Sequence, residues 1–190
     1  EHLRLECAEL RKGFEKTGQA AELLRRQRML VDRVLKQIWR QVGMPSPVAL
    51  LAVGGYGRGE LYPHSDVDIL ILLPGTPDAA LEARLENLIS LFWDVGLEVG
   101  HSVRTIAQCK DEAAKDVTVQ TSLLEARLLI GSRSLFQRFH KATSAGFDSQ
   151  EFFKAKQLEQ EQRHAKYQDS PYSLEPNLKE APGGLRDLQV

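Results

Sequence analysis

The sequence has few cysteines, no long hydrophobic run and no excess of charge of either sign. Its two cysteines, Cys7 and Cys109, have neither CxxC spacing nor a nearby pair of histidines. This argues against a zinc site or a disulfide framework and favours a reducing, cytoplasmic setting. The longest apolar run, residues 69–73, is far too short to cross a bilayer, and no signal-peptide pattern is found at the start. We therefore expect no membrane contact.

The charges are nearly balanced, with 25 Lys and Arg against 26 Asp and Glu. A general DNA- or RNA-binding protein would carry a basic excess, so that class is disfavoured. Binding of a single nucleotide stays open, because a local cluster of Arg and Lys is sufficient for it. The chain begins at Glu1 and stops inside a motif-like stretch, and we expect it to be part of something longer.

Three regions differ in hydrophobic pattern. Residues 1–44 repeat apolar side chains at three- and four-residue spacing, with Gly18 and Gly43 where helix C-caps belong. Residues 45–106 contain strand-like runs at 47–53, 67–73 and 97–105, a glycine-rich loop after the first, and a helix expected to start at Thr76–Pro77.

Residues 107–190 are predicted to be helical throughout. Asp116 is the expected cap of a helix that ends at Gly131, and further helices are predicted at 133–145 and 149–168. The fold class that follows is α/β (α+β). A small mixed β-sheet core is flanked by N-terminal helices and by a C-terminal helical region.

The chemistry is expected at Asp66 and Asp68. Residues two apart on a strand project to the same face, so these carboxylates should point together while Val67 and Ile69 enter the core. Carboxylate oxygens suit Mg²⁺, and acids beside so apolar a strand are costly unless an ion or hydrogen bonds compensate. The alternative is a strand-entry turn that Asp66 merely caps.

The turn formed by Gly54 and Gly55 precedes this pair. No lysine follows it as a Walker A loop requires, and no frame fits GxGxxG. Glycines let backbone N–H groups approach phosphate closely, and the Ser65 hydroxyl can donate to the same oxygens. We therefore predict a triphosphate site at Gly54, Gly55 and Ser65.

These residues resemble the nucleotidyltransferase superfamily of DNA polymerase β and kanamycin nucleotidyltransferase. More narrowly, they resemble the bifunctional uridylyltransferase/uridylyl-removing enzymes that modify the PII nitrogen-regulation protein. The resemblance covers most of residues 48–190. It is carried by four motifs: Gly54-Gly55-Tyr56-Gly57-Arg58-Gly59-Glu60-Leu61, Ser65-Asp66-Val67-Asp68, residues 97–105 (LEVGHSVRT) and residues 179–187 (KEAPGGLRD).

The resemblance implies UTP as donor, PII as acceptor partner and Mg²⁺, as two ions delivered with the nucleotide, held by Asp66 and Asp68. A third carboxylate is expected on a neighbouring strand. The corresponding position is Gly100, so Glu98, two residues earlier, is the candidate replacement and third catalytic acid. Its alternative is an ordinary strand glutamate in a salt bridge.

Arg58, Lys179 and Arg186 are candidate phosphate ligands. The alternatives are a turn arginine paired with Glu60 and, for the last two, a plain loop-to-helix junction. The uridylyl-removing activity belongs to a His-Asp hydrolase domain, and no His-Asp dipeptide occurs here, so we expect that activity and the sensor domains to be absent. An adenylyltransferase type, a non-catalytic nucleotide-binding module and a purely helical interaction fragment remain open.

Overall fold

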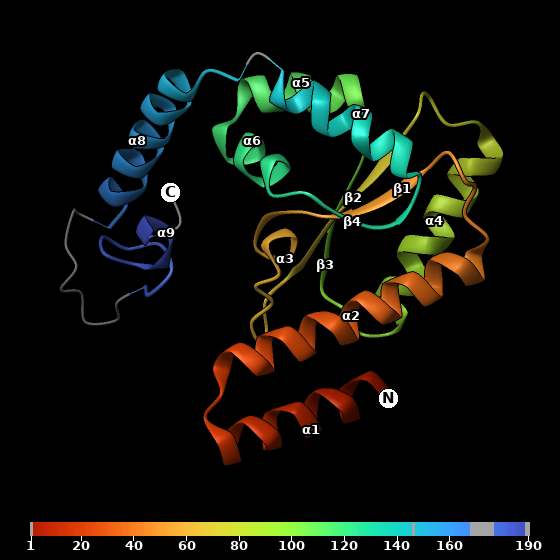
Figure 1. The fold of residues 1–190 in the computed structure, drawn as a ribbon, viewed down its shortest axis with the longest axis horizontal. Coiled ribbons are helices and arrows are strands. Elements are labelled where there is room, and N and C mark those ends of the chain that lie inside the picture. Colours follow the sequence, from red (N-terminus) through yellow and green to blue (C-terminus); the bar gives the residue numbers. More distant parts are fainter. Residues whose placement is uncertain (1, 146, 168–176, 189–190) are drawn as a thin grey trace. The chain divides into compact units, whose positions relative to one another are not determined.

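The computed structural model describes residues 2–145, 147–167 and 177–188. The chain divides into two compact units, residues 1–145 and 146–190, and each is described by itself. The helices and strands of the first unit alternate along most of its length (Figure 1). They are α1 (His2–Thr17), α2 (Ala20–Val42), β1 (Ala49–Ala52), α3 (Gly54–Arg58), β2 (Val67–Leu73), α4 (Ala79–Asp94), β3 (Val99–Thr105), α5 (Ile106–Lys115), α6 (Val117–Leu124), β4 (Arg127–Gly131) and α7 (Arg133–Ser144).

The four strands form one mixed sheet in the order β3-β2-β1-β4. Strand β1 is antiparallel to both of its neighbours, whereas β2 and β3 are parallel. A parallel pair needs a crossover, and α4 supplies it. Helices α2 and α4 cover one face of the sheet, and α5, α6 and α7 cover the other (Figure 1). The predicted α/β class with a small mixed sheet is confirmed.

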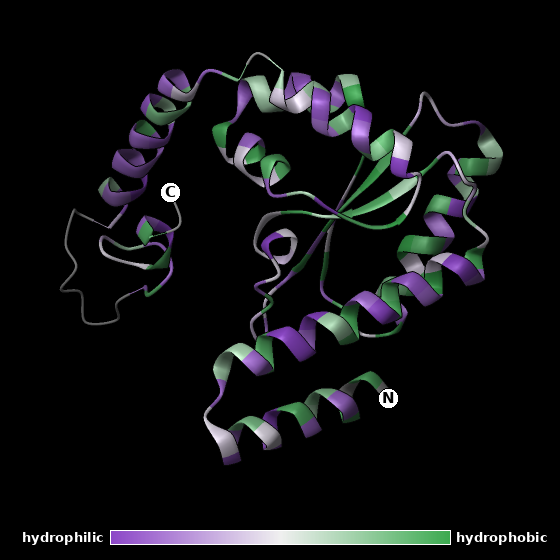
Figure 2. Ribbon diagram, in the orientation of Figure 1, coloured by the Kyte–Doolittle hydropathy of each residue, from purple (hydrophilic) through white to green (hydrophobic). Residues whose placement is uncertain are grey.

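The two faces of the sheet bury two separate apolar clusters. Along β2, alternate side chains enter alternate clusters, as strand geometry requires. Val67, Ile69 and Ile71 pack with α2 and α4, whereas Leu70 and Leu72 pack with α5, α6 and α7. The even-numbered positions of β2 therefore face the α5–α7 layer. In Figure 2 the strands are coloured as hydrophobic for most of their length, while α2 alternates between the two colours.

The N-terminal helices end where the glycines predicted. Gly43 caps α2 in the left-handed conformation, with φ of 67°, and Gly18, with φ of 66°, follows α1. Asp116 caps α6, as expected, by accepting a hydrogen bond from the Thr118 amide. No helix in the described ranges has the length and apolar character needed to cross a bilayer.

Three local predictions were wrong. Residues 127–131 form strand β4 and not the end of a helix, because a short apolar run fits either structure and pairing with β1 decides between them. Residues 54–58 form the short helix α3 and not an open loop. Helix α4 begins after Asp78, whose carboxylate accepts the Leu81 amide, and not at Thr76–Pro77.

The second unit contains α8 (Ser149–Ala165) and α9 (Leu185–Leu188). Its centre is Asp187, which accepts hydrogen bonds from Arg163, His164 and the Gly183 amide at 2.7–3.0 Å. Arg163 is only 5% exposed and also donates to the Glu180 carbonyl. This network fastens the predicted motif at residues 179–187 to α8.

Replacing Asp187 with Asn should loosen this second unit at neutral pH. Burial raises the pKa of Asp187, but the hydrogen bonds from Gly183, His164 and Arg163 lower it overall. Its stabilisation is therefore complete above the unfolded pKa of about 4 and is lost as the pH falls below that value. We expect Asp187→Asn to cost about 2 kcal/mol at pH 7. Hydrogen exchange of the α8 amides measures this loss of stability.

The difference in α8 exchange between wild type and Asp187→Asn should shrink as the pH is lowered from 5 towards 2. Equal exchange at pH 7 would show that Asp187 does not hold this unit together.

Candidate functional site

Asp66 and Asp68 stand at the beginning of β2. Asp68 is the second residue of the strand, and Asp66 immediately precedes its first. Both are exposed, while Val67 between them is 3% exposed and lies in the core. Strand alternation places Asp68 on the face of Leu70 and Leu72, towards α5–α7. The buried position predicted for Val67 and Ile69 is confirmed.

Gly54 brings the end of β1 against Asp68. The Val53 amide donates to the Asp68 carbonyl at 3.0 Å, and Gly54 follows with φ of 56°, a conformation that favours glycine. A Cβ on Gly54 would lie 3.2 Å from Ser122 Oγ and 3.6 Å from Asp68 Oδ2. The Gly54 backbone, the Asp68 carboxylate and the Ser122 hydroxyl therefore adjoin one another.

Ser122 is a site residue that the sequence did not reveal. It lies on α6, more than fifty positions after Asp68, and no motif surrounds it. Its place depends on α6 packing over the sheet, which no spacing in the sequence reports.

Strand β3 sets Gly100 directly beside Asp68 in the parallel register. A Cβ at Gly100 would lie 2.5 Å from Asp68 Oδ1, so the carboxylate occupies the space that a side chain would need. Glu98 precedes β3, is exposed, and accepts the Val67 amide through its carbonyl at 2.8 Å. Within the described ranges no group of three or more His, Cys, Asp or Glu is placed to hold a metal ion. The structure thus does not assemble Asp66, Asp68 and Glu98 into such a group.

Arg58 is held by carboxylates in this structure. Its guanidinium contacts Glu60 at 3.1 Å and Glu125 at 2.5 Å. Burial lowers the pKa of Arg58, but these two glutamates raise it overall and keep the group charged. The ion pair with Glu60, expected as the alternative to phosphate binding, is present. The backbone of Gly55 lies close by, since a Cβ there would be 3.4 Å from the Glu60 carbonyl.

Ser65 lies in the exposed turn before Asp66, where its amide donates to the Tyr62 carbonyl at 3.0 Å. Lys179 and Arg186 belong to the second unit. There Arg186 pairs with Glu180 at 3.2 Å, and its amide donates to the Lys179 carbonyl at 3.0 Å. The structure therefore brings the glycine turn against Asp68, and Lys179 and Arg186 belong to the other compact unit.

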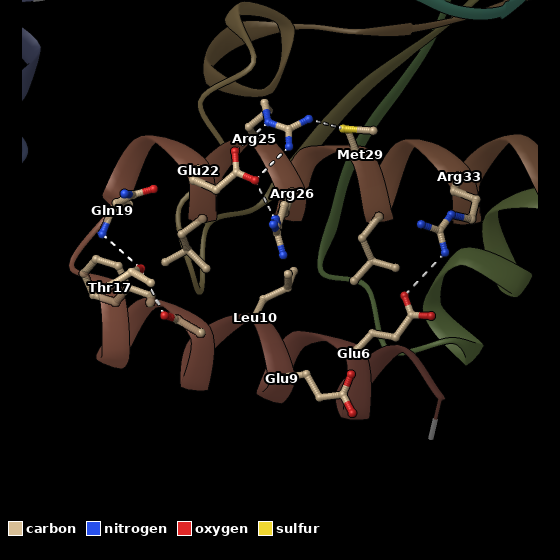
Figure 3. Close-up of a pocket in the computed structure, with 14 residues that line it drawn as sticks. Glu6, Glu9, Leu10, Thr17, Gln19, Glu22, Arg25, Arg26, Met29 and Arg33 are labelled. Atoms are coloured by element: carbon tan, nitrogen blue, oxygen red, sulfur yellow. Dashed lines mark hydrogen bonds and ion pairs between the residues drawn. The ribbon is translucent and has the colours of Figure 1, made fainter.

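Two cavities of about 520 Å³ each involve the N-terminal helices. The first lies between α1 and α2 (Figure 3), and several of its charged side chains pair with one another, as Glu22 does with Arg25 and Arg26. None of the predicted site residues lines it. The second is lined by α1, α2 and the turns at 61–67 and 96–98, and it includes Ser65 and Glu98.

A mixed sheet with a glycine turn held against Asp68 is the arrangement expected of a nucleotide-binding domain. The sequence pattern of the family described as "Nucleotidyltransferase domain" matches residues 32–128. The chain belongs to this nucleotidyltransferase family. A second pattern, described as "GlnD PII-uridylyltransferase", matches residues 151–190.

Individual relatives indicate a narrower group within this family. The chain is 58% identical over 182 residues to a "Bifunctional uridylyltransferase/uridylyl-removing enzyme" of Burkholderia orbicola, covering 96% of this chain and 21% of the relative. It is also 58% identical over 177 residues to the enzyme of that name in Cupriavidus metallidurans, covering 93% and 21%. The chain thus spans about one fifth of the length of these relatives. The resemblance carried by the four motifs is confirmed.

Among solved structures, one chain of a toxin–antitoxin crystal structure with AMP-PNP is 18% identical, with a TM-score of 0.40. The alignment covers 73% of this chain and 96% of that one.

Proposed function

We propose that this chain transfers UMP from UTP to a tyrosine hydroxyl of a PII nitrogen regulatory protein in the cytoplasm and releases pyrophosphate. The observation that carries the proposal is the Gly54 turn held against Asp68, in a chain so similar to uridylyltransferases. The acceptor oxygen forms a bond to the α-phosphorus, the bond from that phosphorus to the bridging oxygen breaks, and pyrophosphate takes the electron pair.

The donor set fits magnesium. Asp66 and Asp68 are exposed carboxylates at the start of a buried strand, and hard divalent ions prefer such oxygens. These two residues would hold the ions, of which we propose two, that arrive with the nucleotide. When bound, magnesium neutralises charge on the triphosphate and activates the attacking hydroxyl.

The chain's own residues position the triphosphate. Gly54 has no side chain where Ser122 and Asp68 approach, and we propose that its backbone amide is a donor to the phosphate oxygens bound beside them. We propose that Gly55, in the same turn, has the same role. The hydroxyls of Ser65 and Ser122 are proposed to donate hydrogen bonds to these phosphate oxygens. Such fixed donors stabilise the charge that develops during transfer.

Glu98 is proposed as the general base that takes the proton of the acceptor hydroxyl. Its carbonyl accepts the Val67 amide just before the β2–β3 pairing begins, and this contact with the start of β2 supports the proposal. Arg58 is proposed to contact phosphate after exchanging its carboxylate partners Glu60 and Glu125 for it. Lys179 and Arg186 are proposed as further phosphate ligands.

The donor and acceptor are tested by incubating the protein with Mg²⁺, PII and each of UTP, ATP, CTP and GTP. We expect labelled UMP on PII and pyrophosphate release with UTP alone. A clear preference for ATP would replace the uridylyl assignment with an adenylyltransferase. Nucleotide binding without transfer to PII or to any added protein would leave only a regulatory module.

Substituting Gly100 with Ala should lower the transfer rate with little change in stability. The new Cβ lies 2.5 Å from Asp68 Oδ1, and the end of a side chain can shift where a backbone cannot. The carboxylate would turn away from its working position, for which we expect a loss of about tenfold or more in kcat. Kinetics and thermal unfolding measure the two effects. A Gly100→Ala variant with wild-type kcat would show that the position of Asp68 is not critical.

A further inference from the structure

The Tyr56 side chain connects the glycine turn to the N-terminal helices. Tyr56 lies on α3, yet its hydroxyl donates to Asp32 Oδ1 on α2 at 2.6 Å. The residue is only 2% exposed, so the ring is packed in the core. The turn is thereby tied to a helix that contributes no other candidate site residue.

Arg127, the first residue of β4, holds the same carboxylate and the same turn. Its Nη1 and Nη2 donate to the two oxygens of Asp32 at 2.8 and 3.1 Å, a bidentate pair. The guanidinium also donates to the carbonyls of Tyr56 at 3.3 Å and Gly57 at 3.4 Å. It lies 5.3 Å from the centre of the Tyr56 ring, within cation–π range.

The protonation states of the three groups suit these roles. Burial raises the pKa of Asp32, but the hydrogen bonds from Arg127 and Tyr56 lower it overall, so the carboxylate stays charged. Burial and the nearby Asp32 raise the pKa of Tyr56, so its hydroxyl stays a donor. At neutral pH the network therefore has one fixed pattern of donors and acceptors.

The glycine turn needs such external support. Helix α3 has five residues, and a helix of that length does not hold its shape alone. Yet its first residue, Gly54, must keep a left-handed φ beside Asp68 and Ser122. Contacts from Asp32 on α2 and Arg127 on β4 fix the turn in place.

We propose that Asp32, Tyr56 and Arg127 are positioning residues that hold the Gly54–Arg58 turn in the geometry that binds the triphosphate. The kinetic consequence rests on the proposed nucleotidyl transfer, whereas the effect on the turn itself does not. None of the three touches substrate; they act through the backbone of α3.

The variant to test is Arg127→Lys, which keeps the charge and loses the fork that reaches both Asp32 and the two carbonyls. The amides of Gly57, Gly59 and Glu60, which are hydrogen-bonded within the turn, serve as reporters for hydrogen exchange. We expect them to exchange at least about tenfold faster well below the Tm, and the KM for UTP to rise about tenfold with kcat changed less than about threefold.

The matched control is Arg33→Lys. Arg33 is also on α2 but makes an exposed ion pair with Glu6 at 3.6 Å, and its replacement should change neither turn exchange nor KM. Tyr56→Phe removes the hydroxyl and keeps the packing. It should shift both readouts in the same direction, and it serves in place of Arg127→Lys if that variant does not fold.

A lower Tm with unchanged turn exchange and unchanged KM would mean a merely structural network and would overturn the proposal. Faster turn exchange in a protein whose wild type transfers no nucleotide would support the positioning role while refuting the proposed function. The positioning role and the proposed nucleotidyl transfer can therefore be refuted independently of each other.

Discussion

Replacing Asp68 with Asn should reduce nucleotidyl transfer on the order of a thousandfold. Asp66→Asn should have an effect of the same size, because both carboxylates are proposed to hold the magnesium that accompanies the triphosphate. Amide oxygens carry no charge and bind hard cations weakly. Both residues are exposed, so the Tm should stay within a few degrees of the wild type, and the loss of rate will not reflect unfolding.

The assay is steady-state transfer of UMP to PII at saturating UTP and Mg²⁺, together with calorimetry of Mg²⁺-dependent UTP binding. The matched control is Asp94→Asn, since Asp94 is an exposed aspartate at the end of α4 that is not one of the proposed site residues. Asp94→Asn should transfer at the wild-type rate. Equal activity of the wild type and the Asp66→Asn/Asp68→Asn double variant would refute the site.

The Glu98→Gln variant should be measured in the same assay, because its loss of transfer rate can be compared with the losses of the two aspartate variants. A general base is worth about a hundredfold or more, so we expect a smaller loss than for either aspartate. The kcat should fall while UTP binding is preserved. A rate within twofold of the wild type would remove Glu98 from the mechanism, in keeping with the absence of a three-acid group among the described side chains.

The sequence predicted the parts of the site that depend on local pattern. Strand β2 was predicted with its observed limits because Val67 and the apolar run at residues 69–73 are bounded on both sides by turn residues. Strand geometry alone places Val67 and Asp68 on opposite faces of the sheet. The helix ends at Gly18 and Gly43 follow from the left-handed conformation that glycine tolerates.

What the sequence could not predict depends on contacts between distant segments. The run that became β4 is too short for periodicity to identify, and its pairing with β1 made it a strand. Ser122 and Arg127 reach the glycine turn only because α6 and β4 pack beside it. The role of Asp32, one of many charged residues on α2, follows only from its hydrogen bonds with Tyr56 and Arg127.

Replacing Gly57 with Ala should have the largest effect on stability. Gly57 has a helical, unstrained backbone, so the constraint is space alone: a Cβ there would overlap the Glu125 carbonyl oxygen and lie 3.1 Å from that of Ala52. Both are backbone atoms, which cannot turn away as a side chain can. Either α3 or the α6–β4 junction must move, for which we expect a cost of about 3 kcal/mol and a fall in Tm of about 10 °C.

The same displacement should weaken UTP binding, because α3 carries Gly54 at its other end. The control is Gly13→Ala in α1, where nothing lies within 4 Å of the new Cβ. Alanine is the better helix former there and should add about 0.5–1 kcal/mol of stability without altering UTP affinity. Thermal unfolding and calorimetry of both variants give the comparison. If Gly57→Ala unfolds at the temperature of Gly13→Ala, the close approach of α3 to the α6–β4 backbone is not what fixes the turn. The turn would then be fixed by side-chain contacts such as those of Arg127. The Arg127 side chain is long enough to reach the turn from β4 without a close approach of the β4 backbone.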